Sequence, residues 1–351
     1  MKIFGYVLKI VLLPFALLYG IVMEIRNGLY AAGILKTHRF AVPVISVGNL
    51  TTGGTGKTPF TIYLASLLKE RYPRLTVVSR GYGRKSKGLQ VVSNGNRILL
   101  SPKASGDEPS LIAHKLAATP VLVAERRYEA ISYALQKLKS DCILLDDAFQ
   151  HRSVYRDVDI ILWNTKEPWR SGWPLPAGRL REFKHNLKRA HILVYTNIEN
   201  GTTLPSMSLD LPSFRLSARL KNLINLDFKI MGTFDVLLGK AVAAFAGIAH
   251  PKNFKRSLES AGVAPQLFFS YKDHHEFTLP EIEKMCNACQ EVAIDTLLCT
   301  EKDLIKLVEL NGLEDILRQK AMAIYAVELA IELDKDEMFL QKINDLLTTG
   351  E

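Results

Sequence analysis

Hydrophobic positions fall into short, fully apolar runs that alternate with segments of spaced apolar residues. Runs of five or six apolar residues are typical of strands buried on both faces, and spaced apolar positions over about ten residues are typical of helices. The predicted strands are Val42–Val47, Leu75–Ser79, Thr119–Ala124, Asp141–Asp147, Asp159–Trp163 and His191–Tyr195. The predicted helices between them are Phe60–Lys69, a helix that starts near Pro109, and Tyr128–Lys139. This alternation predicts an α/β fold with a doubly wound, mostly parallel sheet.

The first residues form the most apolar segment of the chain. Ile3–Met23 contains one charged residue, Lys9, and one proline, Pro14. Its charge-free part, Ile10–Met23, is shorter than the roughly 20 residues of a spanning helix. The pattern predicts an apolar N-terminal helix that lies in the plane of a membrane, while a single span and a helix packed on the protein's own core stay as alternatives. The lack of a small-residue cleavage site argues against a signal peptide.

Glycines and a Gly-Lys-Thr sequence connect the strand Val42–Val47 to the next helix. Strand, glycine-rich turn, lysine and helix follow each other in this order in a phosphate-binding P-loop, where backbone N–H groups and the helix N-terminus surround the phosphates. Lys57 would reach the β- and γ-phosphates, and the Thr58 hydroxyl would bind Mg²⁺. Thr51 stands where glycine is usual, so we expect the pair Gly53-Gly54 to supply the flexibility. The predicted cofactor-binding residues of this loop are Gly53, Gly54, Thr55, Gly56, Lys57 and Thr58.

Acidic residues stand at the end of one predicted strand and at the start of one predicted helix, where a ligand would bind. The strand Asp141–Asp147 ends in two adjacent acids, as a Walker B strand does, and Asp146 would hold Mg²⁺ beside Thr58. Asp107 opens a helix between the two phosphate-site elements. It either points into the crevice at the carboxyl edge of the sheet or caps its own helix.

Two further motifs lie in the second half of the chain. Asp273-His274 is either a proton relay or metal contact, or a structural pair. Thr300-Glu-Lys-Asp303 loosely resembles the base-reading element of P-loop nucleotide binders. In that interpretation Lys302 lies along the nucleotide and Asp303 accepts from the ribose or base, and helix capping is the alternative.

Arginines recur in the predicted loops, and their guanidinium groups match phosphate bidentately. The segment Trp169–Arg189 combines aromatic residues, prolines and many cations. It forms either a surface for a phosphorylated sugar or lipid headgroup, or a solvated basic loop.

Composition adds little. A length of 351 residues indicates about two domains, and a net charge of +9 favours anionic partners or serves solubility. We expect an N-terminal helix and link at 1–39, a P-loop domain at 40–222, a linker at 223–238, a second, smaller α/β domain at 239–325, and a return strand and C-terminal helix at 326–351. The four cysteines are too few for a disulfide framework and fit a reducing cytoplasm. Cys286 and Cys289 form a single C-x-x-C pair without a second pair to complete a zinc site.

Seven short motifs occur in an order that resembles a known family. They are Ser46–Leu50 with Gly53–Pro59, Ser79–Arg84, Gly106–Pro109, Leu145–His151, Pro176–Glu182, Asp273–His275 and Thr300–Asp303. The chain resembles the tetraacyldisaccharide 4'-kinases, the lipid A 4'-kinases of Gram-negative bacteria. The resemblance implies a P-loop kinase-type fold, ATP and Mg²⁺ as cofactors, and phosphorylation of the 4'-hydroxyl of an acylated glucosamine disaccharide 1-phosphate. It also implies action at the cytoplasmic face of the inner membrane, with a lipid substrate and a membrane surface as partners, and with no nucleic acid and no obligate protein partner.

The resemblance also implies roles for individual residues. Asp107 would act as base towards the 4'-hydroxyl, with His274 orienting or tuning it, and domain closure would bring the two together. Catalytic roles are implied for Asp107, His274, Lys57 and Asp147, a metal site for Thr58 and Asp146, and substrate contacts for Arg80, Arg127, Gln150, Arg181 and Glu182. Ala148 and Phe183 depart from the family's usual glycine and proline.

Two other functions fit the residues alone. One is a membrane-associated P-loop nucleotide switch that recruits partners, although such a switch would not need Asp107 or Asp273-His274. The other is a soluble P-loop kinase of a polar metabolite, with the N-terminal segment packed on its own core.

Overall fold

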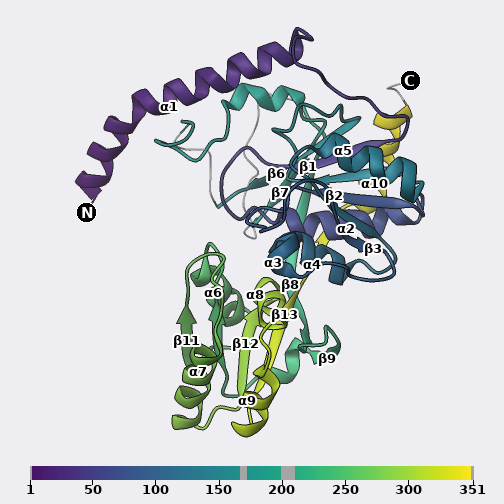
Figure 1. Ribbon diagram of the computed structural model, residues 1–351. Coiled ribbons are helices and arrows are strands. Elements are labelled where there is room, and N and C mark those ends of the chain that lie inside the picture. Colours follow the sequence, from purple (N-terminus) through teal and green to yellow (C-terminus); the bar gives the residue numbers. More distant parts are fainter. Residues whose placement is uncertain (1, 167–171, 199–209, 349–351) are drawn as a thin grey trace.

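The computed structural model describes residues 2–166, 172–198 and 210–348. The chain forms two α/β lobes, and a long N-terminal helix, α1 (Lys2–Ala31), extends beside the first lobe (Figure 1). The predicted α/β fold with a mostly parallel sheet and an apolar N-terminal helix is confirmed.

The first lobe is built on parallel strands. Their spatial order is β7 (Ile192–Thr196), β6 (Val158–Asn164), β1 (Val44–Gly48), β5 (Cys142–Asp146), β2 (Leu75–Ser79), β4 (Pro120–Val123) and, antiparallel at the edge, β3 (Gln90–Asn94). The helices of this lobe are α2 (Lys57–Lys69), α3 (Pro102–Ser105), α4 (Asp107–Lys115), and α5 (Arg127–Tyr133) with its π-helical extension η1 (Ala134–Leu138). The strands β1 and β5 are buried on both faces, as their unbroken apolar runs predict.

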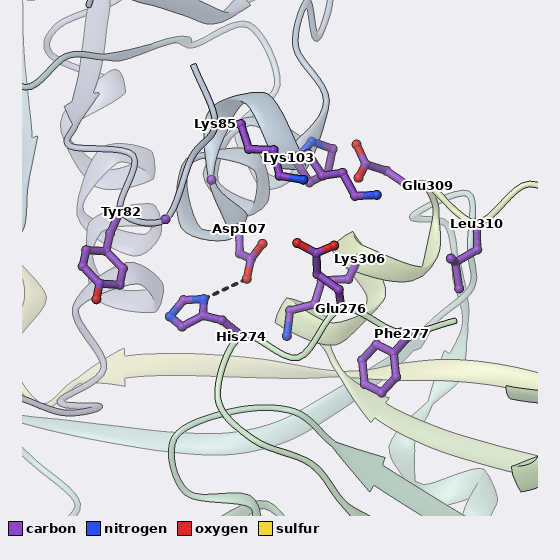
Figure 2. Close-up of a pocket in the computed structure, with 13 residues that line it drawn as sticks. Tyr82, Lys85, Lys103, Asp107, His274, Glu276, Phe277, Lys306, Glu309 and Leu310 are labelled. Atoms are coloured by element: carbon purple, nitrogen blue, oxygen red, sulfur yellow. Dashed lines mark hydrogen bonds and ion pairs between the residues drawn. The ribbon is translucent and has the colours of Figure 1, made fainter. Parts of the chain in front are cut away.

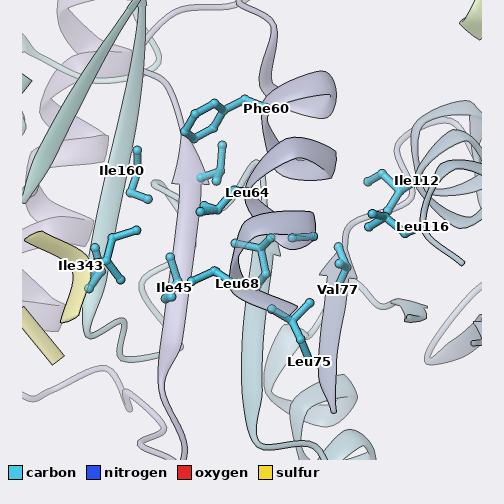
Figure 3. Close-up of a cluster of buried hydrophobic side chains, with 14 of the residues drawn as sticks. Ile45, Phe60, Leu64, Leu68, Leu75, Val77, Ile112, Leu116, Ile160 and Ile343 are labelled. Atoms are coloured by element: carbon cyan, nitrogen blue, oxygen red, sulfur yellow. The ribbon is translucent and has the colours of Figure 1, made fainter. Parts of the chain in front are cut away.

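A hydrophobic core holds the P-loop helix against the sheet (Figure 3). Phe60, Leu64 and Leu68 recur at helical spacing along α2 and are almost completely buried against strand residues such as Ile45. The C-terminal helix α10 (Asp336–Thr348) returns to this core, where Ile343 is fully buried. The end of the chain therefore stabilises the lobe that carries the P-loop.

The second lobe contains four parallel strands in the order β11 (Leu267–Ser270), β10 (Ala243–Ala246), β12 (Thr296–Thr300) and β13 (Ala323–Leu333). Its helices are α6 (Pro251–Ser260), α7 (Leu279–Glu291), α8 (Glu301–Leu307) and α9 (Leu313–Gln319). Cys286 and Cys289 are both buried in the core of this lobe, among apolar side chains of α7 and its neighbours.

One long strand joins the two lobes into a continuous sheet. The first residues of β8 (Ser213–Ile224) pair in parallel with β7, and the rest pair antiparallel with β13. Residues 223–238, which we expected to be a linker, contain the end of β8, the strand β9 (Ile230–Thr233) and the 3-10 helix η3 (Phe234–Leu237). Phe234 and Leu237 are buried in the second lobe, so this segment belongs to a folded core. The strands β8 and β13 make the connection between the lobes.

Helix α1 has two different faces. Ala16, Gly20 and Asn27 recur at helical spacing and are buried, while Leu18, Val22 and other large apolar residues of the same helix are about half exposed. In the described part of the chain, the segment Ile10–Ala31, with mean hydropathy 1.6, is long and apolar enough to cross a membrane.

A tight contact at the end of β1 gives the first prediction. A Cβ on Gly48 would lie 2.6 Å from the Phe149 Cβ and 2.9 Å from the Phe149 backbone nitrogen, and neither atom can move freely because Phe149 is fully buried. We expect Gly48→Ala to lower the free energy of unfolding by about 1–3 kcal/mol through overpacking.

Denaturant titration in detergent measures this change. Gly232→Ala is the matched control, because the nearest side-chain atom to its Cβ lies at 3.9 Å. Equal stability of Gly48→Ala and the wild type would contradict the packing described for this corner.

Candidate active site

The P-loop follows β1 at the carboxyl edge of the sheet and ends at the first residue of α2. Gly53 and Gly56 have φ values of 117° and 80°, which only glycine adopts readily, and Gly56 is the residue before the helix. Gly54 does not need such a conformation, but a Cβ there would meet no atom within 4 Å. The turn therefore depends on Gly53 and Gly56, rather than on the pair Gly53-Gly54 as we expected, and Gly54 leaves open space beside the loop.

The loop is fastened to a second segment, residues 172–189, which we call the rim segment. Thr51 forms a short antiparallel bridge with Leu180, and the Thr52 backbone N–H donates to the Arg179 carbonyl at 2.8 Å. Inside the loop, Asn49 Nδ2 donates to Thr55 Oγ1 at 2.9 Å. Thr51, where glycine is usual, thus serves as the pairing residue between the P-loop and the rim segment.

Asp146, the last residue of β5, is buried beneath the P-loop helix. Thr61 Oγ1 donates to one carboxylate oxygen at 2.9 Å, and Ser79 Oγ donates to the other at 3.3 Å. Burial, together with the nearby charges of Glu108 and Asp147, raises the pKa of Asp146 to about 6. Sequence reasoning missed Thr61, although it lies one turn after Thr58 on the same face of α2.

Asp147 lies between two cations. Its oxygens accept from Arg181 Nη1 at 2.8 and 3.0 Å, and Lys57 Nζ lies 3.6 Å from Oδ1. Burial alone would raise the pKa of this carboxyl, but the charges of Lys57 and Arg181 outweigh it and hold the pKa below its usual value. Asp147 also has a positive φ of 48°, which turns its side chain out of the strand direction.

These acids suit a magnesium ion whose remaining ligands are phosphate oxygens and water molecules. Within the described residues, no group of three or more His, Cys, Asp or Glu side chains is arranged to hold a metal alone. Mg²⁺ usually takes only one or two protein ligands beside phosphate and water, so this is the expected pattern. Burial and the nearby charges of Glu108 and Asp147 raise the pKa of Asp146, and a divalent cation would relieve this crowding of negative charge. Thr58 is buried at the start of α2, above the same strand end.

Asp107 and His274 come from different lobes and meet across the cleft (Figure 2). His274 Nδ1 lies 3.0 Å from Asp107 Oδ2. The hydrogen bond to Asp107 raises the pKa of His274 against the effect of partial burial. Burial opposes the ionised form of Asp107, but the hydrogen bond from His274 and the charge of Lys306 hold its pKa below the usual value. Asp107 does not cap α4, because the residue at the cap position is Gly106.

A cavity of about 290 Å³ adjoins this pair and is shared by both lobes. Figure 2 shows Lys85 and Lys103 on the first-lobe side, and Glu276 and Lys306 on the second-lobe side. The cavity lining combines three lysines, the carboxylates of Asp107, Glu276 and Glu309 and the His274 imidazole, which suits a polar ligand.

The structure corrects the predicted roles of Lys302 and Asp303. Lys302 Nζ donates to Glu108 Oε1 at 2.5 Å, so it joins α8 to α4 instead of lying free along a nucleotide. Asp303 is completely buried and accepts from the Gly247 backbone N–H and from Lys306. It has no surface left for a ribose or base, and the capping alternative applies: Thr300 Oγ1 accepts from the Asp303 backbone N–H.

The predicted substrate residues surround the two acids at the end of β5. Gln150 Nε2 donates to the carboxylate of the fully buried Glu182 at 3.1 Å. Arg127 is 3% exposed, and burial and the charge of Arg80 lower its pKa to about 10. Arg80 is exposed at the end of β2. Glu182 is thus a structural partner of its neighbours, while Arg80 is exposed and Arg127 is buried near Asp146 and Asp147. Trp169 lies outside the described residues.

Comparison with known proteins decides the family. The family model "Tetraacyldisaccharide-1-P 4'-kinase" (LpxK) matches residues 8–348. The chain belongs to this family. It is 40% identical to the tetraacyldisaccharide 4'-kinase of Chlorobium luteolum over 318 residues, covering 87% of this chain and 89% of that one. It is 37% identical to the Aquifex aeolicus enzyme over 330 residues, covering 93% and 95%.

A solved structure agrees with the same assignment. The crystal structure of the "apo" form of LpxK from Aquifex aeolicus in complex with ATP superimposes with a TM-score of 0.80 at 36% identity, covering 97% of this chain and 99% of that one. The prediction of a tetraacyldisaccharide 4'-kinase, a phosphate-transferring enzyme of lipid A synthesis, is confirmed. The predicted α/β fold is thus that of a solved LpxK structure.

The hydrogen bond between the lobes predicts the titration of His274. A raised pKa keeps His274 protonated as pH rises past 6.5, and a lowered pKa keeps Asp107 ionised as pH falls past 3.8. Both groups are therefore charged between the pKa of Asp107 and the pKa of His274 in the folded protein. The stabilising effect of the pair is lost as pH rises through the folded pKa of His274. We expect NMR titration of the imidazole to give a pKa above 6.5 that falls in Asp107→Asn.

The smaller contribution of Asp273 supplies the control for this titration. Asp273 Oδ2 lies 3.9 Å from His274 Nε2, so Asp273→Asn should lower the pKa of His274 less than Asp107→Asn does. An unchanged imidazole pKa in Asp107→Asn would show that the two groups do not interact in solution.

The corrected role of Asp303 gives another prediction. Asp303→Ala leaves the ammonium of Lys306, whose side chain is 8% exposed, without its carboxylate. We expect a loss of unfolding free energy on the order of 3–5 kcal/mol, with KM for ATP near the wild-type value in the folded fraction. Asp315→Asn, in an exposed pair with Arg318, is the control and should leave stability nearly unchanged. A stable Asp303→Ala enzyme with a raised KM for ATP would restore the nucleotide-contact interpretation.

Proposed function

We propose that this enzyme transfers the γ-phosphoryl group of Mg-ATP to the 4'-hydroxyl of a tetraacylated glucosamine disaccharide 1-phosphate. One observation carries the proposal: Asp107 is held by His274 of the opposite lobe at the edge of the sheet where the P-loop and the two acids of β5 also end. The name of the family, and the ATP complex of the Aquifex aeolicus relative, support the choice of acceptor and donor.

Asp107 has the properties of a general base. Its lowered pKa keeps it ionised at neutral pH, and His274 occupies only the Oδ2 atom. Oδ1 then accepts the proton of the sugar hydroxyl as the hydroxyl oxygen attacks the γ-phosphorus. The protonated imidazole beside it stabilises the ionised carboxylate before transfer and fixes its orientation.

Lys57 and Arg181 both form ion pairs with Asp147 in the ligand-free structure. When a nucleotide binds, Lys57 turns from Asp147 to the β- and γ-phosphates, and Arg181 still compensates the carboxylate. A Mg²⁺ ion held by Thr58 and Asp146 would neutralise charge on the phosphate oxygens. Arg80 and Arg127 add positive charge for the acidic substrate.

The form of α1 fits an acceptor that stays in a bilayer. Its outward side chains, Leu18, Val22 and Ile25 among them, are 54–61% exposed and apolar. Its other face contacts the rim segment through Tyr19 and Asn27, which favours a helix lying in the membrane plane over one that crosses it. We place the enzyme at the cytoplasmic face of the inner membrane of a Gram-negative bacterium, acting without an obligate protein partner.

Turnover of the purified enzyme tests this function. With Mg-ATP and the disaccharide 1-phosphate in mixed micelles, we expect a 4'-phosphorylated product. Asp107→Ala and Lys57→Ala should each lower kcat by about a hundredfold or more, because general base catalysis and phosphate stabilisation each contribute on this order. Product is measured by transfer of labelled phosphate to the lipid.

His275→Gln is the matched control for His274→Ala. His275 follows His274 directly, but its Nε2 lies 3.1 Å from Glu281 of the same lobe, away from Asp107. We expect His274→Ala to lose most of its turnover and His275→Gln to keep it. Absence of lipid product from the wild type, with ATP still bound, would refute the proposed acceptor.

A further inference from the structure

A single buried amide stands out in the apolar helix α1. Asn27 is 5% exposed, although the surrounding residues on the outer face are large and apolar. Its Nδ2 donates to Glu182 Oε2 at 2.9 Å and to Asn186 Oδ1 at 3.3 Å. A membrane anchor needs no such group, and an amide in an apolar helix is costly unless it is bonded. The position of Asn27 therefore calls for a role within the protein.

Glu182 connects this amide to the active site. The Glu182 carboxylate is completely buried and also accepts from Gln150 Nε2 at 3.1 Å and from Arg189 Nη2 at 2.6 Å. Gln150 Oε1 in turn accepts from Arg181 Nη1 at 3.4 Å, the same nitrogen that bonds Asp147. A continuous set of hydrogen bonds thus runs from α1 to the acid that faces Lys57.

Other polar contacts of α1 end on the same residues. Tyr19 Oη donates to the Arg181 carbonyl at 3.0 Å, and Arg26 Nη2 donates to the Gln150 carbonyl at 2.9 Å. The helix also fits closely at Gly20, where a Cβ would lie 2.5 Å from the ring of Phe183. The docked face of α1 therefore fixes the backbone and the side chains of the two residues that position Asp147.

We propose that Asn27 is a positioning residue of the kinase, acting through Glu182 and Gln150 to hold Arg181 on Asp147. The proposal rests on the proposed function, because its readout is phosphoryl transfer. Arg181 is the cation that stays with Asp147 once Lys57 turns to the phosphates. Loss of Asn27 would leave the Glu182 carboxylate with fewer hydrogen-bond donors. The side chains of Gln150 and Arg181 could then shift. The helix that meets the membrane is in this way also a structural part of the phosphate site.

Two substitutions on α1 separate positioning from membrane binding. Asn27→Leu removes the amide and makes the helix more apolar, so membrane binding is kept or strengthened. Val22→Asn performs the opposite exchange at a position that is 54% exposed, so it weakens membrane binding without reaching the rim segment. Steady-state kinetics in mixed micelles and sedimentation with vesicles are measured for both variants.

We expect Asn27→Leu to lower kcat about tenfold, the typical effect of losing a hydrogen bond to a charged group, with KM for ATP changed less than about twofold. Val22→Asn should keep the wild-type kcat. In a double-mutant cycle, Asn27→Leu should have no further effect on kcat in the Glu182→Gln background, because both changes interrupt the same contacts. Tyr19→Phe preserves the ring and the packing and should lower kcat by a few-fold. It is the second test variant if Asn27→Leu does not fold.

Three results would overturn the proposal: a wild-type kcat in Asn27→Leu, multiplicative effects in the double variant, or a wild-type kcat in a folded Tyr19→Phe when Asn27→Leu does not fold. An inactive wild type would instead refute the proposed function, so the two failures are distinguishable.

Discussion

The active site is held together by the need to compensate three acids that crowd together at one edge of the sheet. Asp146 is 1% exposed, and the partly buried side chains of Glu108 and Asp147 lie close to it. An uncompensated charge on a buried acid costs several kcal/mol. The compensating cations come from the P-loop, the rim segment and the second lobe: Lys57, Arg181 and Lys302. Segments far apart in the sequence therefore converge because each supplies a charge that the others need.

The same arrangement places the proposed base, Asp107, and its hydrogen-bond partner, His274, in two lobes that meet at one cleft. β8 and β13 connect the lobes through a continuous sheet, while Lys302–Glu108 and His274–Asp107 bridge the opening. Side-chain bridges across a cleft can form when domains close about a hinge, and the shared sheet keeps the two lobes connected. In the proposed function, the enzyme admits an acylated sugar from a membrane surface and then excludes water, which requires connected lobes and a cleft that opens.

Local patterns predicted much of this molecule, and long-range contacts account for what they missed. The P-loop and the acids ending β5 were recognisable because their chemistry requires fixed spacing within a few residues. Asn27 and Glu182 are 155 residues apart, and nothing in either neighbourhood indicates the bond between them. Asp303 was misinterpreted because a Thr-x-x-Asp sequence that begins a helix looks the same whether it reads a base or caps the helix.

The most direct test is a crystal structure of the enzyme with Mg²⁺, a non-hydrolysable ATP analogue and the disaccharide 1-phosphate. The proposed mechanism predicts the 4'-oxygen within about 3 Å of Asp107 Oδ1 and in line with the γ-phosphorus, with His274 still bonded to Oδ2. It also predicts Lys57 on the phosphates and Arg181 on Asp147. A 4'-oxygen bound away from Asp107, or a γ-phosphate outside the P-loop, would contradict it.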